Sequence, residues 1–230
     1  MTFSDTLLEV NLGFIKNEKS ASVALVKPIP DPRRFGVAQI DQQGFVERFI
    51  EKPEDLSNNL VMVGFYYFNS GEALVEAIKE QFKKDIKLKG EYFLADALNL
   101  MIGHGTKFRI EQIETWLDAG TPEALFETNR YLLEHGYANH KKYKTSSDVA
   151  LISPSFIHPT AEVKNSVIGP NVSIGANCKI ENVVIRNAIV DEETHLTDLV
   201  LQDSLVGRYV NIEGKASSMN VGDNTSWVMK

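Results

Sequence analysis

Three charged side chains stand where this chain could bind a ligand. Asp118 lies in the segment WLDAGTPEALFETNRYLLEHG, residues 116–136. It stands at the end of a predicted strand and is followed by a glycine turn and then an amphipathic helix. Glu51 and Lys52 stand together before Pro53, at the end of a predicted hairpin. Carboxylates accept hydrogen bonds or bind cations, and a lysine ammonium pairs with phosphate. Two plainer interpretations stay open, in which Asp118 only helps to start a helix and the Glu51–Lys52 pair is a solvated hairpin end.

The elements around these residues predict an α/β arrangement in the first part of the chain. ASVALVKPI (21–29) indicates a buried strand, and residues 36–52 indicate a hairpin with its tip at residues 41–44. NLVMVGFYYFNS (59–70) is apolar on both faces, which is typical of a central strand. KFRIEQIETW (107–116) predicts one strand leading to Asp118.

Three helices are indicated by capping residues and apolar periodicity. Ser70 should cap the first, in SGEALVEAIKEQF, and the second, EYFLADALNLMIGHG (91–105), should stop at Gly103 or Gly105. Thr121 should cap the third, with Pro122 at its first position and Gly136 at its end.

The last third of the sequence has a different period. Branched apolar residues recur at gaps of five or six, and IGPNVS followed by IGANCK is the clearest repeated pair. This spacing predicts a left-handed parallel β-helix of three hexads per turn, because each short strand buries its inward aliphatic only by stacking on the next coil. The expected interior residues are Ile157, Val163, Ile168, Ile174, Ile180, Ile185, Val190, Leu196, Leu201, Val206 and Ile212.

Composition limits the function classes. The chain has 230 residues and a formal net charge of −7, without a long basic run, which argues against nucleic acid as a partner. It has neither a signal-peptide pattern nor an apolar stretch of membrane-spanning length, so we expect no membrane partner. Cys178 is the only cysteine, which excludes an internal disulfide and favours a cytoplasmic location.

Motifs along nearly the whole chain resemble those of one family. The stretches RRFGVAQID, FVERFIEKP, LVMVGFYYF, GEYFLADAL and WLDAGTPEALFETNRYLL, followed by hexads, are similar in order and spacing to sugar-1-phosphate nucleotidyltransferases of the glucose-1-phosphate thymidylyltransferase and mannose-1-phosphate guanylyltransferase type. The resemblance implies the C-terminal portion of a Rossmann-like nucleotidyltransferase domain, followed by a β-helix tail. The expected divisions are a partial α/β domain at 1–138, a linker at 139–152 and the β-helix at 153–230.

The resemblance also implies a reaction and a set of site residues. In it, a sugar 1-phosphate oxygen attacks the α-phosphate of a nucleoside triphosphate and releases pyrophosphate. Asp5 and Asp118 match the family's Mg²⁺ ligands, and Asp118 and Lys52 are the expected catalytic residues. The remaining expected contacts are made to the sugar phosphate. Glu51 should bind the sugar hydroxyls and Lys52 the phosphate, and the backbone of Gly36 and Gly64 should lie against the sugar.

Two departures from the family pattern alter the expectation. The glycine-rich loop G-G-x-G-T-R-L-x-P-x-T, which holds the triphosphate in the family, is absent from this sequence, so we expect the chain alone to be inactive. Asp5 follows Ser4 where the family usually has glycine, and we expect this N-terminal stretch to fray.

Other functions remain open. The chain could be a regulatory or assembly subunit that binds a sugar phosphate or nucleotide sugar and forms a homo-oligomer through its solenoid. A hexapeptide acyltransferase is disfavoured, because His158 and His195 are better explained as surface residues than as a catalytic base.

Overall fold

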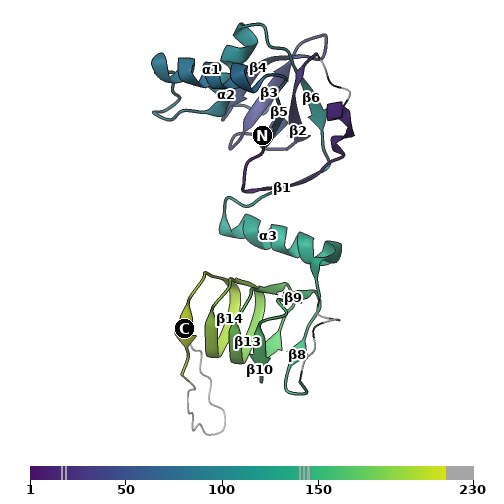
Figure 1. The fold of residues 1–230 in the computed structure, drawn as a ribbon, viewed down its shortest axis with the longest axis vertical. Helices are drawn as coiled ribbons and strands as arrows, with labels where there is room; N and C mark the ends of the chain where they lie inside the picture. The colour runs from purple at the N-terminus through teal and green to yellow at the C-terminus, as the bar shows by residue number, and fades with distance from the viewer. Residues whose placement is uncertain (17, 19, 140, 142, 144–145, 216–230) are drawn as a thin grey trace, which may run out of the picture. The chain divides into compact units, whose positions relative to one another are not determined.

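The computed structural model describes residues 1–215, except 17, 19, 140, 142, 144 and 145. The chain divides into two compact units, Met1–Ala119 and Gly120–Lys230, and Figure 1 labels most of their helices and strands. The domain division suggested by the sequence, at residues 138 and 153, stays a prediction.

A five-stranded sheet organises the first unit, in the order β4-β3-β5-β2-β6. The hairpin is confirmed, and its tip closes where Asp41 accepts hydrogen bonds from the Gln43 and Phe45 amides. The LVMVGFYY strand is central, as predicted. The strands are β2 (Ser22–Pro28), β3 (Gly36–Ile40), β4 (Val46–Glu51), β5 (Leu60–Tyr67) and β6 (Phe108–Gln112).

Both faces of this sheet are covered, which explains why its inner strands β2 and β5 are largely apolar on both faces. In β2, Ala24 and Val26 join the core beneath α1 (Gly71–Lys83) and α2 (Leu94–Gly103), the two helices that pack together in Figure 1. Val23 and Leu25 alternate with them and join a second core on the opposite face. Ser70 caps α1 by accepting a hydrogen bond from the Ala73 amide, as predicted.

The stretch predicted as one strand at residues 107–116 is two strands, so that prediction is wrong. β6 pairs in parallel with β2, and the chain leaves the sheet beyond Ile113, whose amide still donates to Val26 O at 3.0 Å. β7 (Thr115–Asp118) then pairs antiparallel with β1 (Thr6–Glu9) in a separate two-stranded ribbon. The 3₁₀ turn η1 (Leu12–Lys16) follows β1 in the chain. The chain leaves the direction of β6 because β1 offers an antiparallel partner to β7.

The N-terminal residues are also paired, contrary to the fraying expected of them. β3 pairs with β5 only at Val61, which leaves the later part of that edge open to another segment. Phe3 N donates to Gly64 O and Tyr66 N donates to Met1 O, both at 2.9 Å. Residues 1–3 therefore continue the β3 side of β5.

The second unit begins with α3 (Pro122–Leu132), which Thr121 caps as predicted by accepting from the Ala124 amide. The helical segment continues as η2 (Leu133–Tyr137), where Gly136 takes a φ of 102°, as expected for a glycine at a helix end. Asn129 on α3 accepts a 2.6 Å hydrogen bond from the Ser173 hydroxyl and donates to Asn171 O at 3.3 Å. These bonds attach α3 to the strands that follow.

Those strands form a parallel β-helix, as the hexad period predicts. Pairs such as Glu162–Lys179 and Lys179–His195 join successive coils of 17 and 16 residues, and Figure 1 shows the strands stacked side by side. Residues at the corners of the coils, among them Asn182 and Asn187, have positive φ values in the left-handed backbone region. The strands are β8 (Ala150–Leu151), β9 (Ser155–Ile157), β10 (Glu162–Lys164), β11 (Val167–Ile168), β12 (Val172–Ile174), β13 (Lys179–Val190), β14 (His195–Val206) and β15 (Asn211–Glu213).

The predicted interior is right at all positions but one. The inward aliphatics are buried or half-buried from Ile157 to Val206, and Ile174 and Ile180 are at most 1% exposed. Ile212 is 37% exposed, so its assignment to the interior is wrong. It lies on β15, the last coil that the structure describes, and its burial needs another coil stacked upon it. Within the described residues, no helix has the length and apolar character needed to cross a membrane.

Candidate functional site

A pocket of about 220 Å³ lies within the first unit, and it gathers most of the candidate residues. Asp5, Gly36, Glu51, Gly64 and Asp118 all line it, although the chain separates the first from the last by more than a hundred residues. The other lining residues are Phe3, Thr6, Arg34, Phe35, Met62, Val63, Tyr66, Phe93, Leu94, Ala95 and Trp116. This mixture of aromatic walls and a few polar groups is typical of a small-molecule site.

The ribbon of β1 and β7 forms one wall of the pocket. Thr6 lies opposite Asp118 in the ladder, and the Ala119 amide donates to Asp5 O at 2.9 Å, so both aspartates stand at the same end of the ribbon. Trp116 is two residues from Asp118 and therefore on the same face of β7. Its indole Nε1 donates to Thr6 Oγ1 at 2.7 Å, which fixes the ring.

The β3–β4 hairpin supplies a second wall with Gly36 and Glu51, which are paired residues of the ladder. A Cβ at Gly36 would collide with Met62 Cε and would lie 2.9 Å from Glu51 Oε2. The glycine thus makes room for the glutamate itself. Burial raises the pKa of Glu51, with an opposing effect from Lys52 and a smaller raising effect from Asp96.

Tyr66 lies beside this carboxylate in the wall. Its side chain is buried, and its hydroxyl donates to Met62 Sδ at 3.5 Å. Burial raises the pKa of Tyr66, and the charge of Glu51 raises it further, so the phenol stays protonated as a hydrogen-bond donor.

Gly64 contributes through its backbone conformation and through what packs on it. Its φ is +77°, which disfavours any residue with a Cβ, and an added Cβ would lie 2.8 Å from Phe3 Cδ2. The space next to Gly64 therefore holds the Phe3 ring. Gly64 shapes the pocket by letting residues 1–3 approach β5.

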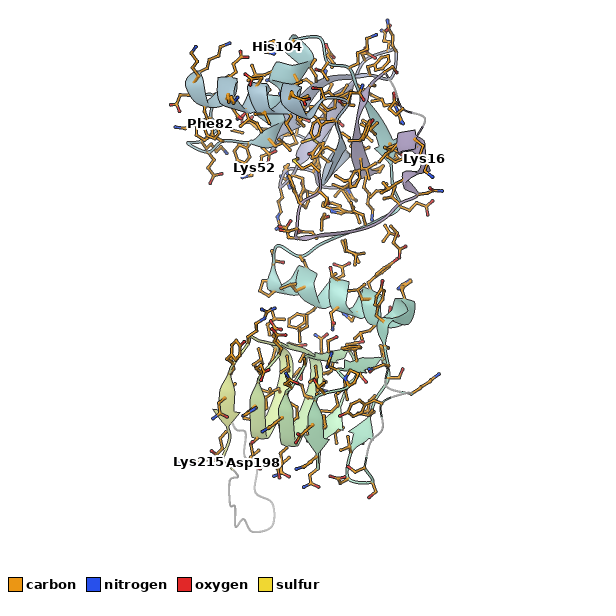
Figure 2. The ribbon with its side chains drawn as sticks, in the orientation of Figure 1. Lys16, Lys52, Phe82, His104, Asp198 and Lys215 are labelled. Atoms are coloured by element: carbon orange, nitrogen blue, oxygen red, sulfur yellow. The ribbon has the colours of Figure 1, made fainter. Side chains whose placement is uncertain are left out.

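Lys52 is the one predicted site residue that does not line the pocket. Its φ of 47° turns the backbone at the end of β4, and its amide donates to Phe35 O at 2.9 Å. The ammonium lies 4.7 Å from the centre of the Phe93 ring and 4.0 Å from Glu91 Oε2. Lys52, labelled in Figure 2, thus lies against a residue that lines the pocket but is not part of the lining itself.

Sequence reasoning missed the basic member of the lining, Arg34, and two polar ones, Thr6 and Tyr66. Arg34 immediately precedes Phe35 and Gly36, so its position next to a proposed site glycine was the available signal. For Thr6 and Tyr66, the only signal in the sequence that they belong to the site was their closeness to Asp5 and Gly64.

The donor set suits a hard divalent cation that keeps several waters. Asp5 and Asp118 offer carboxylate oxygens in one pocket, and Mg²⁺ binds commonly through one or two carboxylates, phosphate oxygens and water. Among the described residues, no group of three or more His, Cys, Asp or Glu side chains forms a complete protein cage. The pair fits Mg²⁺ that is shared with a phosphate ligand.

The solenoid histidines have structural surroundings. His158 Nδ1 lies 2.9 Å from Thr160 Oγ1 in a turn between β9 and β10. His195 is a half-buried residue of β14, in register with Lys179 and Asn211. These contacts are those of surface residues on a stacked sheet.

Comparisons with known proteins agree with this architecture. Residues 6–135 match the Nucleotidyl transferase family, and residues 151–224 match the GMPPB C-terminal domain. The chain is 30% identical over 222 residues to the low-salt glycan biosynthesis nucleotidyltransferase Agl11 of Haloferax volcanii, a match that covers 87% of this chain and 60% of that protein.

Two further relatives carry names of the same kind. Glucose-1-phosphate thymidylyltransferase of Streptomyces antibioticus is 28% identical, with 86% of this chain and 60% of that protein covered. A probable mannose-1-phosphate guanyltransferase of Schizosaccharomyces pombe is 27% identical, with 86% and 53% covered. The chain spans only about half to three-fifths of the length of these relatives. The chain belongs to the sugar-1-phosphate nucleotidyltransferase family.

Proposed function

We propose that the pocket binds a sugar 1-phosphate, or the sugar-phosphate part of a nucleotide sugar, as the sugar side of a nucleotidyltransferase site. One observation carries the proposal. Of the six residues picked out by family resemblance, five line a single pocket: Asp5, Gly36, Glu51, Gly64 and Asp118.

The chemistry of the lining suits a sugar. Glu51 has a half-buried carboxylate that can accept hydrogen bonds from two hydroxyl groups, and burial strengthens such bonds. Phe35 and Trp116, whose ring centroids are 5.1 Å apart, provide an apolar wall for the ring of the ligand. Lys52 is proposed to reach the phosphate from its position beside Phe93.

The proposed reaction forms one bond and breaks one. A phosphate oxygen of the sugar 1-phosphate attacks the α-phosphorus of a nucleoside triphosphate, the bond from that phosphorus to the bridging oxygen breaks, and pyrophosphate leaves. Asp5 and Asp118 would hold Mg²⁺, which supplies neutralisation of the phosphate charge when bound. The chain's own residues orient the sugar phosphate, which is the main requirement of this chemistry.

Binding and turnover are separate parts of the proposal. The sequence lacks the glycine-rich triphosphate loop, so the chain alone should bind the sugar phosphate but make no nucleotide sugar. Isothermal titration with glucose 1-phosphate and mannose 1-phosphate tests binding, with and without Mg²⁺. Replacement of Asp118 by Asn should abolish the dependence on Mg²⁺, and Glu51→Ala should weaken both complexes about 10-fold or more.

Turnover is tested by pyrophosphate release with the common nucleoside triphosphates. The chain should be active only when a segment carrying the glycine-rich loop is supplied separately. Binding without turnover in either condition would favour a regulatory or assembly subunit, and failure of both sugar phosphates to bind would refute the proposal.

We also propose that the solenoid mediates self-association. Ala150, Val167, Val184 and Val200 form an outward ladder across four coils, and Val184 and Val200 are 46% and 80% exposed. A repeated flat apolar face can meet its own copy about a two-fold axis. Light scattering coupled to size exclusion should give a dimer or larger species that Val184→Lys dissociates.

The single buried thiol, Cys178, is consistent with the proposed cytoplasmic location.

A further inference from the structure

We propose that Arg34 is an anion-binding residue of the pocket, which contacts the phosphate of the bound sugar phosphate directly. The inference rests on the proposed function. It concerns a residue that the sequence motifs did not single out, and its basis is the composition of the pocket lining.

The lining needs a cation if an anion is to bind there. Asp5, Glu51 and Asp118 all contribute carboxylates, and among the described residues of the lining Arg34 alone carries a positive charge. A phosphate placed near three carboxylates without a neighbouring cation is repelled. Mg²⁺ can offset the two aspartates, and the charge of Lys52 acts on Glu51 from outside the lining, which leaves Arg34 as the cation within the lining itself.

Arg34 is held by a chain of contacts that ends in the ribbon of β1 and β7. Its Cζ lies 5.9 Å from the centre of the Phe35 ring. Phe35 meets Trp116 edge to face, and Trp116 donates to Thr6. An arginine placed against an aromatic ring keeps its planar fork available for a phosphate, which accepts two parallel hydrogen bonds from it.

The preceding arginine has a different role, although it is identical in type. Arg33 Nε and Nη2 donate to the two carboxylate oxygens of Asp31 at 2.8 and 2.7 Å, and its amide donates to Asp31 at 3.2 Å. This bidentate pair lowers the pKa of Asp31 to about 2, with Arg34 as the smallest contributor. Arg33 is therefore committed to its own loop, and only Arg34 lines the pocket.

Lys52 is placed differently from Arg34. Its ammonium lies over Phe93 and near Glu91, and it must leave these groups to reach a ligand in the pocket. Arg34 already belongs to the wall. We therefore expect the loss of Arg34 to weaken phosphate recognition at least as much as the loss of Lys52.

The test uses the full chain and three probes, which are glucose 1-phosphate, glucose and inorganic phosphate. Arg34→Gln should weaken glucose 1-phosphate binding about 10-fold or more, the usual range for loss of a charged hydrogen bond, and should leave glucose binding unchanged. Arg34→Lys should restore part of the affinity, because it returns charge without the fork. Arg33→Gln is the matched control and should bind like the parent.

A second measurement separates this inference from the proposed function. Phenylglyoxal labels arginines, and mass spectrometry can follow Arg34 and Arg33 individually. Inorganic phosphate should slow the labelling of Arg34 and leave the labelling of Arg33 unchanged. Protection of Arg34 without glucose 1-phosphate binding would support the anion site while refuting the sugar-phosphate function. Unchanged glucose 1-phosphate affinity in Arg34→Gln would overturn the inference, and so would absence of protection when no sugar phosphate binds.

Discussion

Asn99 should be the residue through which α2 holds the Glu51-bearing strand in place. Its side-chain amide accepts from Phe49 N and donates to Phe49 O, both at 2.8 Å. β4 is one of the two edge strands of the sheet, and these two backbone groups belong to its outer side. Phe49 is only 1% exposed, so water is a poor substitute for the amide.

Asn99→Ala should lower the free energy of unfolding of the first unit by ~2–4 kcal/mol. Each lost hydrogen bond contributes ~1 kcal/mol, and each backbone group left unpaired near the core adds ~1 kcal/mol or less. If the loss is expressed as local opening, exchange of the Phe49 amide should accelerate by a factor between ~30 and ~700, at 1.4 kcal/mol per decade. Hydrogen exchange followed by mass spectrometry over β4 measures this directly.

Two further variants make the reasoning refutable. Gln43→Ala, at the exposed tip of the same hairpin, should leave exchange and stability unchanged. Asn99→Asp keeps an acceptor for Phe49 N but places a carboxylate against Phe49 O, so its stability should improve when acid protonates the new carboxyl and supplies a donor. Exchange of the Phe49 amide at the parental rate in Asn99→Ala would refute the role given to this amide.

Three shorter predictions follow from burial and backbone conformation. Burial raises the pKa of Glu51 above its ordinary value of 4.5, so folding favours its protonated form, and that stabilisation is lost as pH rises through the raised pKa. Urea midpoints should therefore show Glu51→Gln gaining on the parent as the pH rises above 4.5. Ile180→Ala, at a 1% exposed position, should destabilise the solenoid by ~2–5 kcal/mol in chemical unfolding, whereas Val200→Ala, at 80% exposure, should change it by less than ~0.5 kcal/mol. Gly64→Ala should cost ~1 kcal/mol or more by thermal melting, because φ is +77° and Phe3 fills the space.

The repetitive part of the fold was the most predictable from sequence. A parallel β-helix depends on near-neighbour stacking, so the five- and six-residue spacing of aliphatics determines which residues face inward. Ile212 shows the limit of that rule. It obeys the spacing, yet it is 37% exposed because burial also depends on the coil above, which spacing does not describe.

The α/β unit was less predictable where pairing depends on distant segments. The residues of KFRIEQIETW alternate from Lys107 to Glu111 and then lose that period, so the interpretation as one strand fits only the first part. The break between β6 and β7 arises because β2 accepts the first part in parallel and β1 accepts the second in antiparallel. Neither partner is signalled within the stretch. The same pairing brings Asp118 beside Asp5, which the family pattern indicated and local sequence did not.

Adjacent candidate residues pose a further problem that only geometry resolves. Successive residues of a strand point to opposite faces, so Glu51 and Lys52 are poorly suited to enter the same pocket from one extended segment. In the structure Glu51 lines the pocket, while the backbone turns at Lys52 and carries its ammonium to Phe93. The arginine pair shows the same division, because Arg33 binds Asp31 and Arg34 lines the wall. A motif can therefore locate a site to within a residue, but the path of the backbone decides which neighbour reaches the ligand.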